Sequence, residues 1–160
     1  MAGQAGYNFR FLDTAVAVNE EQFDRVVKKI SNAIGGDLKG KTVAVWGLTF
    51  KAGTHDLRDS PSLAVIKRLQ AEGAIINAHD PTVQEHKEGI PAQVVILKEP
   101  LEACENADAV VLLTDWEEYK TLNPDEVIER LANPNLIDTR NVFDPKEWED
   151  RGFTYQGIGR

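Results

Sequence analysis

The chain has 160 residues, of which 42% are hydrophobic and 28% charged, a composition typical of one globular domain with an appended element. Its net charge of −8 argues against a nucleic-acid partner, because contact with a phosphate backbone requires a basic surface. We expect no membrane span and no signal peptide, since neither an apolar run of about 18 residues nor a basic-then-apolar N-terminus is present. A single cysteine cannot form an internal disulfide bond, so the sequence predicts a cytoplasmic protein.

The first predicted element is a helix from Asn8 to Ile34, about 27 residues or roughly 40 Å long. Its apolar residues recur at alternating spacings of three and four and form one seam, with Asn19 as the polar member: Phe9, Leu12, Val16, Phe23, Val26, Ile30 and Ala33. A seam of this length favours a helix that pairs with a second copy in a homodimer. The alternative is a helix that lies along the surface of its own domain.

Gly35-Gly36 ends this helix, and strands then alternate with helices as far as the C-terminus. Strands are predicted at Thr42–Trp46, Ala74–Ala78, Gln93–Leu97, Ala109–Leu113, Leu136–Ile137 and Phe153–Ile158. Helices are predicted at Ser62–Glu72, Pro100–Asn106, Pro124–Leu131 and Pro145–Arg151, with a helix or loop at Thr82–Gly89. This order predicts an α/β fold, a Rossmann-like three-layer sandwich with a mostly parallel sheet, preceded by one long α-helix.

A long polar loop follows the first strand, and Ser60 and Pro61 are suited to the N-cap and first position of the next helix. In an open α/β sheet, ligands bind where the carboxyl ends of strands meet helix N-termini. Lys51 and Arg58 lie on this loop, which makes it a candidate anion site, with phosphate the favoured anion. The alternative is that both cations form surface ion pairs with aspartates of the same loop, Asp56 and Asp59.

Arg140 follows a later predicted strand in the way that Lys51 follows the first. Because the carboxyl ends of parallel strands share one edge of the sheet, the two cations are expected to converge there. A guanidinium group binds phosphate with two parallel hydrogen bonds. The alternative for Arg140 is an ion pair with Asp138 or Asp144.

Asp80 follows the second predicted strand as a ribose-binding acid does in dinucleotide folds, but the first turn is GLTFKAGT rather than G-x-G-x-x-G. We therefore expect Asp80 to form a turn with Pro81. Cys104 has acidic neighbours, which raise a thiol pKa, so it is predicted to be structural. The histidines show no metal-ligand spacing with Cys104, and no metal site is predicted. The residues thus indicate an anion- or nucleotide-binding domain without a visible catalytic base or nucleophile.

Five motifs resemble, in the same order, the C-terminal part of the UDP-glucose/GDP-mannose dehydrogenase family: AVAVNEEQ, GLTFKAGTHDLRDSPS, ADAVVLLTDWEEY, DTRNVFDP and FTYQGIGR. The resemblance extends from about Gly6 to Arg160. It implies that residues 1–36 are the C-terminal part of a central dimerisation helix. Residues 37–160 would be a UDP-sugar-binding α/β domain. Members of this family oxidise a nucleotide sugar at C6 in two steps with two NAD+.

The resemblance also implies roles for individual residues. It places Phe50, Lys51 and Arg140 against the nucleotide sugar, and Arg58 near an NAD that is bound mainly by a domain outside this chain. The segment with the family's catalytic cysteine also lies outside this chain, so no catalytic residue is assigned and the chain alone is expected to be inactive. The sequence departs from the family at Ala52, His55 and Thr139, where proline, an acid and glycine are common.

Within the family, the QGIGR ending and the DTRN motif favour the members that convert UDP-glucose to UDP-glucuronate. The same domain of an enzyme acting on GDP-mannose or a UDP-N-acetyl sugar is the close alternative. A non-catalytic dimerisation module, with the long helix as its contact element, is the alternative of a different class.

Overall fold

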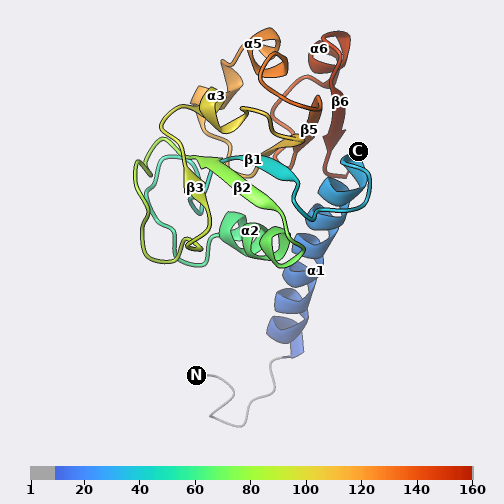
Figure 1. Ribbon diagram of the computed structural model, residues 1–160. Helices are drawn as coiled ribbons and strands as arrows, with labels where there is room; N and C mark the ends of the chain where they lie inside the picture. The colour runs from blue at the N-terminus through green and yellow to red at the C-terminus, as the bar shows by residue number, and fades with distance from the viewer. Residues whose placement is uncertain (1–9, 160) are drawn as a thin grey trace.

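The computed structural model describes residues 10–159, with side chains described from residue 18 onward. Six strands form one sheet in the order β3-β2-β1-β4-β5-β6, and every neighbouring pair is parallel (Figure 1). The strands are β1 (Thr42–Trp46), β2 (Ile75–His79), β3 (Val95–Ile96), β4 (Ala109–Leu112), β5 (Asn135–Asp138) and β6 (Thr154–Gly157). The order reverses direction between β1 and β4, where ligands bind in doubly wound sheets.

Helices cover both faces of the sheet, because successive residues of each strand point to opposite sides. The helices are α1 (Arg10–Ala33), α2 (Pro61–Ala71), α3 (Pro100–Ala103), α4 (Glu117–Lys120), α5 (Pro124–Ile128) and α6 (Pro145–Asp150). Val43 and Val45 of β1 pack with α1 and α2 on one face, whereas Ala44 and Trp46 pack with the remaining helices on the other. Figure 1 shows α1 and α2 on one side of the sheet and α3, α5 and α6 on the other. The predicted Rossmann-like sandwich with one long preceding helix is therefore confirmed.

The second face is built around aromatic side chains. The Trp46 indole stacks on Tyr119 with ring centroids 5.5 Å apart, and it donates a hydrogen bond from Nε1 to the Pro100 carbonyl at 2.9 Å. Phe143, Trp148 and Phe153 continue the cluster toward α6 and β6. Such pairs add to the free energy gained by burying the rings, and they fix α4 and α6 on the sheet.

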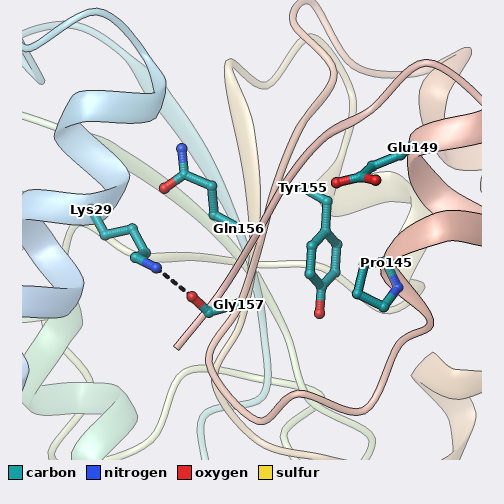
Figure 2. Close-up of a pocket in the computed structure, with 6 residues that line it drawn as sticks. All are labelled: Lys29, Pro145, Glu149, Tyr155, Gln156 and Gly157. Atoms are coloured by element: carbon teal, nitrogen blue, oxygen red, sulfur yellow. Dashed lines mark hydrogen bonds between the residues drawn. The ribbon is translucent and has the colours of Figure 1, made fainter. Parts of the chain in front are cut away.

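The C-terminal half of α1 packs on its own domain. Val27 and Ile30 are buried in the core, and Phe23, Val26 and Ala33 are partly buried against it. Lys29 donates a hydrogen bond to the Gly157 carbonyl, which ties α1 to β6 (Figure 2). This half of the predicted seam follows the alternative of a helix lying along the domain. Asn19 is exposed, Phe9 lies outside the described residues, and so do the side chains of Leu12 and Val16. The homodimer stays a prediction.

The differences from the predicted elements are local. The one-turn helix α4 was not predicted, because four residues are too few to show a helical period. Residues 82–89 form a loop, which is one of the two predicted alternatives, and β3 has only two residues of the five predicted. Tertiary contacts rather than sequence patterns fix the ends of such short elements.

Gly47 allows the chain to leave β1 and pass close to the end of β4. Its φ is +95°, and a Cβ atom placed on it would lie 2.4 Å from Thr114 Cβ and 2.6 Å from Thr114 N. Neither atom can move away easily, because Thr114 is fully buried and belongs to the segment that directly follows β4. Position 47 therefore requires glycine for both its backbone conformation and its lack of a side chain.

We predict that Gly47→Ala lowers the free energy of unfolding by about 3 kcal/mol or more, from backbone strain together with overpacking. Gly53→Ala is the matched control, because Gly53 also has a positive φ, +78°, but a Cβ atom placed on it would meet nothing within 4 Å. That control should lose only about 1 kcal/mol. Urea denaturation of both variants measures the difference, and equal losses would contradict the close-contact explanation.

Candidate functional site

The carboxyl ends of three central strands lie level at one edge of the sheet. Trp46 of β1 pairs with Leu112 of β4, which in turn pairs with Asp138 of β5. The segments that follow these residues carry Lys51 and Arg140, so both predicted cations belong to the same edge. This edge also lies beside the N-terminus of α2, since Pro61 and Ser62 line a cavity with Arg140.

The loop after β1 is fixed by hydrogen bonds from other segments and within itself. Ser60 Oγ donates to the Leu48 carbonyl at 2.6 Å, and Thr114 Oγ1 donates to the Thr49 carbonyl at 2.8 Å. Ser60 therefore occupies the predicted N-cap position of α2, but its hydroxyl holds the loop instead of capping the helix. Within the loop, the Phe50 N–H donates to the Asp56 carbonyl at 2.9 Å.

Phe50 and Lys51 project from this fixed backbone. Phe50 is 48% exposed, which is unusual for so large an apolar side chain, and Lys51 is exposed beside it. Among the described residues, the Lys51 amino group makes no hydrogen bond or ion pair, so the alternative of a pair with Asp56 or Asp59 does not hold for it. Two consecutive residues thus expose an apolar ring and an ammonium group at the edge where parallel sheets bind ligands.

Arg58 is paired within its own loop. Its Nε and one terminal nitrogen donate to the two carboxylate oxygens of Asp56, at 3.0 and 2.9 Å. The Arg58 side chain is 88% exposed, so the pair is screened by water and stabilises the fold little. For Arg58 the ion-pair alternative is what the structure shows. The hydrogen bonds from its side chain, then from its backbone N–H, lower the pKa of Asp56 to about 2.

The Arg140 side chain lies near Asp115, which was not among the partners considered for it from the sequence. Its backbone N–H donates to Asp138 Oδ1 at 2.9 Å, but its Nε lies 3.5 Å from Oδ1 of Asp115, the residue that follows Thr114. The alternative of an Arg140 ion pair with Asp138 or Asp144 therefore does not hold, because the side chain lies beside Asp115 instead. Arg140 remains 38% exposed, and it lines a cavity of about 170 Å³ with Phe23, Val26, Ser62 and Thr139 among its walls.

Two further cavities of about 460 Å³ lie elsewhere on the surface. One extends along α2, and its lining includes the cations Arg58, Lys67 and Arg68 as well as the acids Glu20 and Asp59. The other lies between α1, α6 and β6, where the cation among its lining residues, Lys29, already binds the Gly157 carbonyl (Figure 2). None of the predicted site residues lines that second cavity.

Asp80 is fully buried, and its carboxylate binds the protein itself. The predicted turn forms, because the Thr82 N–H donates to Asp80 Oδ1 at 3.0 Å. In addition, Asp80 Oδ2 accepts hydrogen bonds from the backbone N–H groups of Leu48 and Thr49. The carboxylate therefore has no oxygen directed at a ribose, and the sequence missed its contacts with the loop.

Cys104 and His79 fit structural roles. Cys104 is buried, and burial raises the pKa of its thiol to about 12, as is typical of a structural cysteine. His79 is buried against Tyr119, with Nδ1 3.1 Å from the tyrosine hydroxyl, and burial lowers the His79 pKa. No group of three or more potential ligands that could hold a metal ion occurs in the described part of the chain.

The strand order and the loops at its carboxyl edge are those of a doubly wound α/β domain, a class that binds nucleotides at this edge. Residues 44–145 match the family model described as "UDP-glucose/GDP-mannose dehydrogenase family, UDP binding domain". The chain belongs to this family and contains its UDP-binding domain. No helix within the described residues is long and apolar enough to cross a membrane.

Similar proteins agree with this assignment. A UDP-glucose 6-dehydrogenase of Rhizobium meliloti is 38% identical over 151 residues, covering 94% of this chain and 35% of the relative. A UDP-D-ManNAc dehydrogenase structure from Pyrococcus horikoshii has a TM-score of 0.81 at 25% identity, covering 100% of this chain and 36% of that one. The structure of a UDP-glucose dehydrogenase from Pyrobaculum islandicum has a TM-score of 0.75 at 25% identity, covering 98% of this chain and 34% of that one. This chain thus spans about a third of the length of the proteins it matches.

We predict that replacing Arg58 with glutamine raises the pKa of Asp56 from about 2 toward its ordinary value of 3.8. The rise should stop short of that value, because the backbone N–H of residue 58 still donates to Asp56. In the wild-type protein the ion pair is present above the unfolded-state pKa and is lost as the pH falls through about 2. NMR titration of the carboxyl carbon measures this, with Lys51→Gln as the control that should leave the pKa unchanged.

Proposed function

We propose that this chain is the UDP-sugar-binding part of an NAD-dependent UDP-glucose 6-dehydrogenase, which oxidises UDP-glucose to UDP-glucuronate with two NAD+. The observation that carries the proposal is the exposed Phe50–Lys51 pair on a loop with a fixed backbone, at the same sheet edge as Arg140. The family's UDP-binding domain and the name of the Rhizobium meliloti relative support it.

The ligand contacts follow from charge and exposure. Lys51 and Arg140 provide the two positive charges that a diphosphate requires, and Lys51 has no competing partner among the described residues. Phe50 offers an apolar face beside them for the base or the sugar. Arg140 can leave Asp115 at little cost, because both side chains are partly exposed and separated by 3.5 Å.

NAD is assigned mainly to a domain outside this chain. The described residues do not fit a complete dinucleotide site, because the Asp80 carboxylate is buried and the sequence after β1 lacks the glycine fingerprint. Arg58 is exposed on the loop and is the residue of this chain proposed to reach the cofactor. When bound, NAD+ accepts the hydride. The role of this chain is to bind and position the substrate, and none of its residues is proposed to react.

The division of the chain also remains a proposal. Residues 1–36 form the end of the dimerisation helix, and residues 37–160 form the UDP-sugar domain of a cytoplasmic enzyme. Because Val27 and Ile30 pack on the domain, they are not available for pairing, and we propose that two copies pair through the N-terminal half of the helix. A pairing surface there is smaller than the full predicted seam.

We predict that UDP and UDP-glucose bind this chain and that Lys51→Ala weakens binding about tenfold, by removing one charge-assisted contact with the diphosphate. Two-dimensional NMR titration of the labelled chain measures this. Shifted resonances should gather at Phe50, Lys51 and Arg140. Lys146→Ala is the control, because Lys146 is an exposed lysine of α6 and lies outside this loop.

Parallel titrations distinguish the alternatives. Stronger binding of GDP-mannose or of UDP-N-acetylmannosamine would assign the domain to a sibling enzyme. A dimer that binds none of the nucleotides would favour the dimerisation module and contradict the proposal. The chain mixed with UDP-glucose and NAD+ should form no NADH, and absorbance at the NADH band tests that point.

We predict that the chain forms a dimer at tens of micromolar concentration and that Val16→Asp makes it monomeric. Val16 belongs to the predicted seam, and a carboxylate placed in a seam opposes pairing. Val18→Asp is the control, because Val18 is 47% exposed and lies outside the seam. Sedimentation equilibrium measures the mass, and a wild-type chain that stays monomeric would contradict the dimer.

A further inference from the structure

The carboxylate of Asp80 is the most heavily hydrogen-bonded side chain described at the carboxyl edge of the sheet. It is 0% exposed and lies directly after β2. The donors to it that the structure describes are uncharged: backbone N–H groups, hydroxyls and an indole. Burying a carboxylate costs free energy unless hydrogen-bond donors surround it. The donors around Asp80 therefore indicate that the carboxylate has a defined structural role.

The two oxygens of Asp80 serve different segments. Oδ2 accepts from Leu48 N at 2.8 Å, from Thr49 N at 3.1 Å and from Thr49 Oγ1 at 3.0 Å. Among the described residues, Oδ1 accepts only from Thr82, through its N–H at 3.0 Å and its hydroxyl at 2.9 Å. One oxygen therefore holds the loop after β1, and the other holds the turn after β2.

Oδ2 acts on the residues that directly precede Phe50 and Lys51. The strand β1 ends at Trp46, so the N–H groups of Leu48 and Thr49 lie beyond the sheet ladder and use the carboxylate instead. Hydrogen bonds to a charged acceptor are about twice as strong as neutral ones. This contact fixes the direction in which the chain leaves the sheet, and with it the start of the ligand loop.

The same oxygen also reaches the segment after β4. Trp116 Nε1 donates to Asp80 Oδ2 at 3.2 Å and to Thr49 Oγ1 at 3.3 Å. Trp116 is the next residue after Asp115, which pairs with Arg140. The loop that carries Lys51 and the partner of Arg140 are thus both positioned by one carboxylate.

We propose that Asp80 is a positioning residue for UDP-sugar binding, which holds the Phe50–Lys51 loop and the Asp115–Trp116 segment in their binding geometry through Oδ2. This inference rests on the proposed function. Asp80 acts through Phe50, Lys51 and Arg140 and does not touch the ligand, because its carboxylate is buried and all of its described contacts are internal.

The test compares Asp80→Asn with Thr82→Val in UDP titrations of the same chain. The amide of asparagine has one acceptor oxygen in place of two, so it cannot satisfy both sets of donors. Thr82→Val removes the hydroxyl that donates to Oδ1 and lies 3.4 Å from the Thr54 carbonyl, and it leaves every contact of Oδ2 intact. We expect Asp80→Asn to weaken UDP binding at least tenfold and Thr82→Val to change it less than twofold.

Hydrogen exchange at the Leu48 and Thr49 amides gives a second measurement, which a general loss of stability does not reproduce. Exchange should accelerate at these two amides in Asp80→Asn, while amides in the middle of β4 keep their protection. If Asp80→Asn fails to fold, Trp116→Phe replaces it, because it removes the indole N–H that donates to Oδ2 and to Thr49 Oγ1 and leaves the other donors to Oδ2 in place. That variant should weaken UDP binding severalfold.

The outcomes separate the two proposals. Unchanged UDP affinity in Asp80→Asn, with a wild-type chain that binds UDP, overturns the positioning role alone. Equal losses of affinity in Asp80→Asn and Thr82→Val also overturn it, since they indicate a general loss of structure. A wild-type chain that does not bind UDP overturns the proposed function and this role with it.

Discussion

The close approach of Gly47 to Thr114 is the contact on which the ligand edge depends. Thr114 is fully buried, its hydroxyl donates to the Thr49 carbonyl, and it lies 3.2 Å from the hydroxyl of Ser62 in α2. The end of β1, the end of β4 and the start of α2 therefore meet around one small side chain. This is the point where the strand order reverses, and it can be this compact only because residue 47 has no side chain.

Both arginines described at this edge are paired with aspartates, so they do not form a continuous patch of positive charge. The chain carries a net charge of −8. At this edge Arg58 lies beside Asp56, and Arg140 lies beside Asp115. Both pairs are at least partly exposed, so they limit the local charge without fixing either guanidinium firmly. Lys51 differs, since its amino group has no such neighbour within the described residues.

The fold, and the location of Lys51 and Arg140 at one edge of the sheet, could be predicted from the sequence, because both depend on local patterns. The β-branched run of β1 and the apolar run of β4 predict buried strands, and the residues after them follow by position. The sequence was not sufficient for the partners of those residues. Asp115 pairs with Arg140 across two neighbouring strands, and Asp80 reaches the loop from β2. Contacts between segments 25 to 36 positions apart leave no spacing signal in the chain.

The joint between α1 and α2 has a mechanical consequence. Arg68 of α2 binds Glu20 and Asp24 of α1 and lies over the Phe23 ring at 5.2 Å, while Phe23 and Val26 also wall the Arg140 cavity. With 24 residues, α1 is a rod of about 36 Å, so tilting it by roughly 5° about its buried end displaces the far end by about 3 Å. Because Phe23 and Val26 belong both to this helix and to the cavity wall, the tilt of α1 and the shape of the Arg140 cavity are geometrically linked.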